Sequence, residues 1–469
     1  MPAAPPVAFA TLAYQQPSRP YITGITPTSL SGHLILQHPD PVLTIADAQT
    51  LQPVEQLTGH TGPVTAVQCE EGSIWSSGKD ATVVRWDERS RRAATTIKAF
   101  IRKPLPVTAL AVSGADHLVV GGTELVSSEA HILFWDTRNA SEPAYRHSST
   151  HSDDITHLSI LPPTASFQVS TGRQLPQRLL LSTATDGCVA LSDLREADED
   201  EAVHAEENWN QSIAAAGSYA FEGRLKVWAR SDMDYVAAWG VGVDADDGEL
   251  QLQDFQEVNS SQFKYRDFAL PQGGPSVVGP AAKERAYPDK LRSEYLIDVC
   301  PSLGVNNRGL PAVGVGSNDG NIVLQHASAF STRDNRPYHP SAYLLTGPGA
   351  ARGHKDVVRA MFHAVRDEAL YTGSEDGVLA GWSLASLPRL LTGNPAIDDD
   401  GGDGREDANS DDDEDEESEI DTESSESDRS DNSDDMEVDD GPRHGPVYGG
   451  GRGRDTRKDK RREKRHAPY

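Results

Sequence analysis

Histidines, paired carboxylates and cysteines are the side chains of this 469-residue chain that could carry chemistry. They form no phosphate-binding loop of Walker type, no His-Glu-x-x-His helix and no Gly-x-Ser-x-Gly elbow, each of which requires a fixed spacing. The acidic pairs Asp153-Asp154 and Asp246-Asp247 lie in stretches that are typical of turns rather than of acid/base pairs. We therefore expect no catalytic residues and a protein that is not an enzyme.

The three cysteines, Cys69, Cys188 and Cys300, are more than a hundred residues apart, so they indicate neither a disulfide framework nor a clustered zinc site. This usage favours a reducing compartment. Residues 1–14 lack the charged and apolar regions of a signal peptide, and no run of ~18 apolar residues occurs. We expect an intracellular soluble protein with no metal, no cofactor and no membrane association.

Many of the histidines and aspartates recur in a unit of roughly 40 to 50 residues. The two clearest copies each hold a histidine, a hydroxyl residue, an aspartate and a tryptophan: His60, Ser76, Asp80 and Trp86 in one, and His354, Thr372, Asp376 and Trp382 in the other. In both copies the aspartate follows the hydroxyl residue by four positions and precedes the tryptophan by six. A buried aspartate without partners is costly, so we expect the four side chains of each copy to lie together.

Short strands must position these side chains. Apolar and polar residues alternate on either side of each aspartate, as in Thr82 to Asp87, which is typical of antiparallel strands joined by tight hairpins. The Gly-His pair, the hydroxyl residue, the turn aspartate and the tryptophan resemble the signature of WD repeats, each of which forms one four-stranded propeller blade. The resemblance implies that the four side chains form a buried hydrogen-bonded chain.

Five weaker units complete the pattern. They run from Ile22 to Leu57, around residues 103–138, from His151 to Ser192, from Ser212 to Trp239 and from Tyr295 to Leu324. Lys103 stands at a histidine position and Ser192 at a tryptophan position. The sequence therefore predicts an all-β, seven-bladed WD-repeat β-propeller over residues 1–391, with an insertion loop at 257–294. We expect the apolar strand Val7 to Leu12 to complete the last blade beside Val378 to Trp382 and close the ring.

The order of further motifs resembles the WD-repeat-containing protein 89 family. The residues that carry the resemblance are Gly122 to Glu124, Leu133 to Arg138, His151 to Thr156, Ser182 to Gly187, Trp209 to Ile213, Glu294 to Asp298, Gly353 to Arg359 and Tyr371 to Asp376. They extend over most of residues 20–390. The resemblance implies a non-enzymatic propeller, nuclear in fungi and without a settled biochemical role, so it transfers the fold and hardly the function.

Charge is concentrated in the last part of the chain. Residues 398–440 carry 24 acidic and two basic side chains, a net charge of −22, and residues 441–469 carry ten basic and three acidic ones, a net charge of +7. We predict a disordered acidic tract at 392–440 and a disordered basic tail at 441–469, because these segments have too few apolar residues to form a core. Ser410, Ser418 and Ser425 fit the pattern of acidophilic kinases, with an unmodified solvating tail as the alternative.

The basic tail contains a dense cationic cluster: Arg457, Lys458, Lys460, Arg461, Arg462, Lys464 and Arg465. Such a cluster indicates nuclear import, so we expect a nuclear protein, with the cytoplasm left open as a second location. The alternative is that the cluster folds back on the acidic tract. Nucleic acid is not expected outside this tail, because no aromatic residue lies within the cluster to stack on bases and the acidic tract competes with phosphates.

Three arginines recur at the ends of consecutive units. Arg89 and Arg138 end Trp-Asp-x-Arg motifs, and Arg195 ends an Asp-x-Arg motif in the next unit. The arrangement resembles the box by which WD-repeat substrate receptors dock on the adaptor of cullin-4 ubiquitin ligases, where a forked guanidinium suits bidentate recognition. The alternative is a local salt bridge at the strand end.

The sequence thus favours a non-enzymatic scaffold that binds protein partners in the nucleus. Two alternatives are a substrate receptor of a cullin-4 ligase, and a chromatin or ribosome-assembly factor that uses its tail near histones or RNA. None of the motifs identifies the partner.

Overall fold

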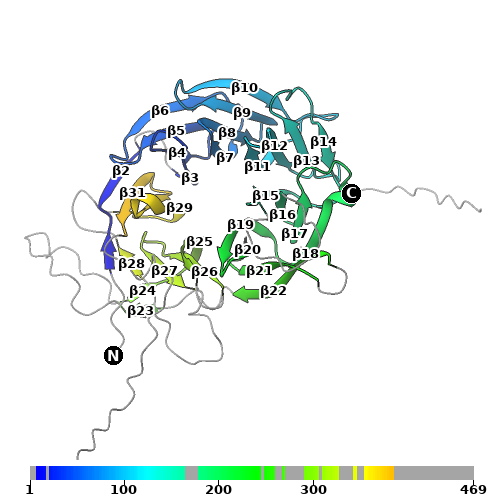
Figure 1. Ribbon diagram of the computed structural model, residues 1–469. Helices are drawn as coiled ribbons and strands as arrows, with labels where there is room; N and C mark the ends of the chain where they lie inside the picture. The colour runs from blue at the N-terminus through cyan, green and yellow to red at the C-terminus, as the bar shows by residue number, and fades with distance from the viewer. Residues whose placement is uncertain are drawn as a thin grey trace, which may run out of the picture. The chain divides into compact units, whose positions relative to one another are not determined.

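Seven β-sheets surround a common axis in the computed structural model of this chain (Figure 1). The structure describes residues 7–16, 21–163, 178–244, 248–258, 267–269, 290–305, 309–326, 342–345 and 353–384, all within one unit, Met1–Asp400. The prediction of an all-β, seven-bladed propeller is confirmed. The predicted acidic tract and basic tail lie outside the described residues.

Within blades 1 to 5 the strands follow the chain order from the axis outward (Figure 1). Blade 1 contains β3 (Gly24–Pro27), β4 (His33–Gln37), β5 (Val42–Asp47) and β6 (Pro53–Thr58). Blade 2 contains β7 (Val64–Glu70), β8 (Ser73–Gly78), β9 (Thr82–Asp87) and β10 (Arg92–Lys98). Blade 3 contains β11 (Val107–Ser113), β12 (Leu118–Thr123), β13 (Ile132–Asp136) and β14 (Tyr145–His147). Blade 4 contains β15 (Ile155–Ile160), β16 (Leu179–Ala184), β17 (Cys188–Asp193) and β18 (Val203–Asn208).

The remaining blades are longer or are completed by the N-terminal segment. Blade 5 contains β19 (Ile213–Phe221), β20 (Arg224–Ser231), β21 (Val236–Val243) and β22 (Leu250–Val258). Blade 6 contains β25 (Tyr295–Val305), β26 (Pro311–Gly316), β27 (Ile322–His326), β28 (Ala342–Leu345) and, outermost, β1 (Val7–Phe9). Blade 7 contains β29 (Val358–Ala364), β30 (Ala369–Ser374), β31 (Val378–Ser383) and, outermost, β2 (Leu12–Gln15).

The N-terminal segment closes the ring, although the predicted single strand Val7 to Leu12 is wrong. β2 pairs antiparallel with β31, with Leu12 opposite Gly381, and supplies the fourth strand of blade 7. β1 instead pairs parallel with β28 of blade 6. The segment is divided at Thr11, whose backbone N–H and hydroxyl both donate to the Gly381 carbonyl (2.8 and 2.9 Å). These two bonds hold the chain where it crosses from one blade to the next.

The core lies between the blades and is formed mainly by their second and third strands. β8, β16 and β26 are buried along their whole length, whereas β10 on the outer edge of blade 2 is mostly exposed. Near the axis, a bulge interrupts the register of the innermost strand in blades 2 to 7. The bulged residue is Thr65 in blade 2 and Thr108 in blade 3. The Thr65 hydroxyl donates to the Val107 carbonyl of blade 3 (2.5 Å), and the Thr108 hydroxyl donates to the Ile155 carbonyl of blade 4 (2.6 Å). These bulges therefore link neighbouring blades.

Four small elements of the described residues lie outside the blades. β23 (Asp267–Ala269) and β24 (Lys290–Arg292) pair with each other inside the range 257–294 that was predicted as an insertion loop; most of that range lies outside the described residues. The short helix α1 (Glu199–Ala202) precedes the last strand of blade 4, and the 3-10 turn η5 (Val365–Asp367) precedes the second strand of blade 7. No helix in the described part of the chain has the length and apolarity needed to cross a membrane.

Candidate functional site

The predicted site residues of blade 2 form one hydrogen-bonded chain. Trp86 Nε1 donates to Ser76 Oγ (2.8 Å), which in turn lies 2.8 Å from His60 Nε2. His60 Nδ1 lies 3.1 Å from the Asp80 carboxylate. Because the Asp80 carboxylate can only accept, the imidazole proton lies on His60 Nδ1, and His60 Nε2 accepts a hydrogen bond from the Ser76 hydroxyl. The chain is buried, with Ser76 fully inaccessible to solvent.

Asp80 connects this chain to the segment that enters the blade. Burial opposes ionisation of Asp80, but hydrogen bonds from the Thr61 N–H (2.7 Å) and the Thr82 hydroxyl (2.7 Å), together with His60, hold its pKa below the ordinary value. The carboxylate is therefore charged at neutral pH. It fastens the turn between β8 and β9 to the segment between β6 and β7, so the four side chains serve the packing of the blade.

Blade 7 holds a looser version of the same chain. Trp382 Nε1 and His354 Nε2 both bond to Thr372 Oγ1, at 2.8 and 2.6 Å. His354 Nδ1, however, lies 3.8 Å from the Asp376 carboxylate, beyond hydrogen-bond distance. Asp376 instead accepts a hydrogen bond from the Lys355 N–H (2.8 Å). The sequence spacing is the same in both blades, but the last link is closed only in blade 2.

Blade 4 lacks the tryptophan. His151 Nε2 lies 2.8 Å from Ser182 Oγ, and its Nδ1 lies 3.7 Å from the Asp186 carboxylate. Burial opposes ionisation of Asp186, but the nearby His151 and hydrogen bonds from two backbone N–H groups outweigh it and lower its pKa to about 2. Ser192, at the tryptophan position, is fully buried, and its hydroxyl has no partner among the described residues.

Blade 3 keeps the tryptophan and lacks the hydroxyl. The buried Trp135 Nε1 has no hydrogen-bond partner among the described residues, because Gly121 occupies the hydroxyl position. A Cβ atom at position 121 would lie 2.9 Å from the Trp135 ring, so the ring occupies the space that a serine would need. Lys103, at the histidine position, is exposed and donates a hydrogen bond to Ser127 instead.

The three predicted interface arginines lie in the turns that follow the third strands of blades 2, 3 and 4, and all are exposed. Arg138 forms a bidentate ion pair with Asp136 of its own motif (2.9 and 2.5 Å). Arg195 reaches Asp116 of blade 3 at 3.2 Å. The Arg89 side chain has no hydrogen bond or ion pair with any described residue. Arg138 thus shows the local salt bridge, Arg195 links two blades, and Arg89 presents an unpaired guanidinium.

Two carboxylates that no sequence motif predicts, the buried Glu88 and the partly buried Glu199, also connect neighbouring blades. Glu88 accepts hydrogen bonds from the Ser29 hydroxyl (2.8 Å) and from the backbone of residues 30–31 (3.0 and 2.7 Å) in blade 1. Glu199 accepts from the three backbone N–H groups of residues 148–150 (2.8, 2.8 and 2.7 Å). Burial opposes ionisation of Glu199, but these bonds and the Thr150 hydroxyl lower its pKa to about 2. No local motif marks either residue, because its partners are about 50 residues away.

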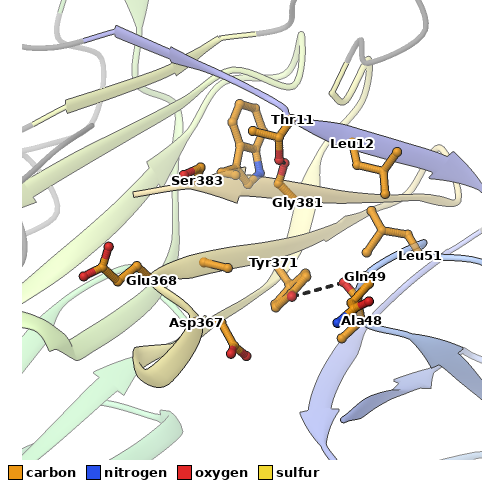
Figure 2. Close-up of a pocket in the computed structure, with 12 residues that line it drawn as sticks. Thr11, Leu12, Ala48, Gln49, Leu51, Asp367, Glu368, Tyr371, Gly381 and Ser383 are labelled. Carbon is orange, nitrogen blue, oxygen red and sulfur yellow. Dashed lines mark hydrogen bonds between the residues drawn. The ribbon is translucent and has the colours of Figure 1, made fainter. Parts of the chain in front are cut away.

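A pocket of about 120 Å³ lies where blade 7 meets blade 1 (Figure 2). Its lining includes Leu12 of β2, Leu51 of blade 1, Tyr371 of β30 and Gly381 of β31. The Tyr371 hydroxyl donates to the Ala48 carbonyl (3.1 Å), which joins the two blades at this point (Figure 2). The acidic residues of the lining, at positions 367 and 368, follow β29. The pocket therefore opens at the seam that the N-terminal strand completes.

Comparison with known proteins bears on the type of repeat. No protein-family model matches the chain. The chain is 26% identical over 334 residues to an uncharacterized WD repeat-containing protein of Schizosaccharomyces pombe, and the alignment covers 69% of this chain and 84% of that protein. The chain is a seven-bladed β-propeller that is similar in sequence to a WD repeat-containing protein. The finer resemblance to the WD-repeat-containing protein 89 family remains a prediction, and the cationic cluster Arg457 to Arg465 lies outside the described residues.

Proposed function

We propose that this WD-repeat propeller is a non-enzymatic scaffold that binds protein partners in the nucleus. WD-repeat propellers typically bind protein partners, and the single observation that carries the proposal here is how the polar side chains are used. The histidine and hydroxyl groups of blades 2, 4 and 7 are bonded to each other inside the blades, and in blade 2 the aspartate joins them. Long charged side chains such as Arg89 are exposed at the turns. The interior thus builds a rigid ring, and the turns face potential partners.

Affinity purification of the full chain with quantitative mass spectrometry tests the scaffold function. We expect a reproducible set of enriched proteins that survives nuclease treatment. The control is the same chain with Ser76→Ala, which removes a buried hydroxyl of β8 and loosens blade 2 without replacing a turn residue. A full chain that enriches nothing above an unrelated propeller contradicts the proposal.

A substrate receptor of a cullin-4 ligase is a second candidate, supported by the unpaired guanidinium of Arg89 and the shared turn position of Arg138. Charge reversal of both, Arg89→Glu with Arg138→Glu, should abolish co-purification of the cullin-4 adaptor. The matched control is Arg92→Glu, an exposed arginine at the start of β10. Adaptor binding that is retained in the double variant, or never detected with the natural chain, rejects this candidate.

The nuclear location is supported by the cationic cluster of the basic tail. Removal of residues 441–469 should shift a fluorescently tagged chain out of the nucleus. Removal of the acidic residues 398–440 alone should leave it nuclear, because the cluster is retained. A chain that stays nuclear without residues 441–469 contradicts this part of the proposal.

A further inference from the structure

Blades 2 and 7 share one repeat spacing but differ at one cross-strand pair. In blade 2, Trp75 of β8 lies opposite Arg85 of β9, and the guanidinium carbon of Arg85 lies 5.6 Å from the centroid of the Trp75 ring. In blade 7, the corresponding pair is Tyr371 of β30 and Gly381 of β31. The aromatic residue is retained, whereas the side chain that lies over it in blade 2 is missing.

Large side chains fill the same position in other blades. The residue that precedes the tryptophan position is Arg85 in blade 2, Phe134 in blade 3 and Leu191 in blade 4. At Gly381 a Cβ atom would lie 3.7 Å from both Leu51 and Tyr371, which is ordinary van der Waals contact. The φ angle of Gly381 is also not positive. Neither crowding nor backbone conformation therefore requires glycine at this position, and its effect is to leave the pocket open.

The surroundings of this pocket are acidic. Asp367 and Glu368 line it and are exposed, and neither side chain forms a hydrogen bond or ion pair with a described residue (Figure 2). Burial raises the pKa of Tyr371, and the carboxylates of Asp367 and Asp47 act in the same direction, as expected for negative charge close to the phenol. Arg366, on the same turn, is exposed and does not line the pocket. Carboxylates beside an aromatic ring suit a cation.

We propose that this pocket binds one arginine side chain of a basic protein partner, with the guanidinium beside the Tyr371 ring and facing Asp367. Blade 2 shows the contact between a guanidinium and a ring within the molecule, through Arg85 and Trp75. Arginine fits better than lysine because its planar, forked group both stacks on rings and pairs with carboxylates. The inference rests on the proposed protein-binding function and adds the chemical class of the partner.

The acidic tract supports a basic partner. Ser383 lines the pocket, and the tract with net charge −22 begins at residue 398, so the chain that leaves blade 7 beside the pocket soon becomes strongly acidic. The negative charge of the tract favours a Lys/Arg-rich partner, and the pocket would select arginine.

Fluorescence anisotropy with the full chain tests the proposal. The probes are three labelled twelve-residue peptides of one sequence that carry four arginines, four lysines or four neutral citrullines. Gly381→Arg places the chain's own guanidinium in the pocket, as Arg85 does in blade 2, and Tyr371→Leu removes the ring. We expect each to weaken binding of the arginine peptide about five- to tenfold. Binding of the lysine peptide, which depends on the acidic tract, should change less than about twofold.

Two conservative variants serve as controls, and thermal unfolding shows that every variant folds. Tyr371→Phe keeps the ring and Gly381→Ala leaves most of the pocket open, so both should bind the arginine peptide as the natural chain does. Equal binding of the arginine peptide to the natural chain and to Gly381→Arg would show that the pocket does not bind arginine. It would not contradict the scaffold function. Normal peptide binding by a chain that enriches no partner would instead count against the scaffold function alone. If removal of residues 441–469 strengthens peptide binding except in Gly381→Arg, the chain's own tail occupies the pocket, and the assignment to a partner is wrong.

Discussion

Three equally buried serines allow the contribution of the hydrogen-bonded side chains within the blades to stability to be measured. Ser76, Ser182 and Ser192 are each fully buried. Ser76 Oγ bonds to Trp86 and His60, Ser182 Oγ bonds to His151, and the Ser192 hydroxyl has no partner among the described residues. Replacement of each by alanine removes the same atom, so differences in stability report the hydrogen bonds that are lost.

The expected losses follow from the number of polar groups left without a partner, at about 1–3 kcal/mol for each buried group. Ser76→Ala leaves two and should reduce the free energy of unfolding by about 2–6 kcal/mol. Ser182→Ala leaves one and should cost about 1–3 kcal/mol. Ser192→Ala removes a hydroxyl that was already unpaired, so it should be neutral or slightly stabilising.

Urea unfolding followed by far-ultraviolet circular dichroism gives these values from the shift of the midpoint at constant slope. Circular dichroism is preferable to tryptophan fluorescence because Trp86 is itself part of the site. Similar losses for Ser76→Ala and Ser192→Ala, or a larger loss for Ser182→Ala than for Ser76→Ala, would refute the reasoning.

Three further outcomes are expected. Deletion of residues 1–15 removes β1 and β2 and should lower the melting temperature by more than about 5 °C in differential scanning calorimetry; an unchanged value would count against ring closure by this segment. Because the pKa of Glu199 is lowered to about 2, its contribution to stability should be complete above about pH 4.3 and lost as the pH falls toward 2, so Glu199→Gln should flatten that part of the melting profile. Gly121→Ser restores the repeat signature of blade 3, but its Cβ would meet Trp135, so it should destabilise the chain by about 1–3 kcal/mol in urea unfolding.

The number and type of the blades could be predicted because the relevant signal is local. The residues of blade 2 from Ser76 to Trp86 span one hairpin, and their spacing determines which side chains meet across it. Repetition of that spacing, even with substitutions such as Ser192, was enough to count seven units. His60 could be assigned to the same chain because Gly-His stands at a similar distance before the hairpins of blades 2 and 7.

Contacts between blades could not be predicted in the same way. The apolar run from Val7 to Leu12 is equally compatible with parallel and antiparallel pairing, so it did not reveal the division at Thr11. Glu88 is part of a predicted motif, but its partners belong to a loop almost 60 residues earlier. The pocket at Gly381 has a weak sequence signal, since aligning the residues before each tryptophan position shows glycine where other blades have Arg85, Phe134 or Leu191.

The central claim is that β2, near the N-terminus, and β31, more than 360 residues later, are neighbouring strands of one blade. Their pairing closes the seven sheets into a ring. An engineered disulfide between Ala13→Cys and Ala380→Cys tests it most directly, because these residues are directly opposite each other in β2 and β31. After mild oxidation and proteolysis without reductant, mass spectrometry should detect the peptide pair that contains positions 13 and 380 in high yield, and Ala13→Cys with Leu379→Cys should give little of its own pair. No linkage between positions 13 and 380, or equal linkage in the shifted control, would contradict the closed ring.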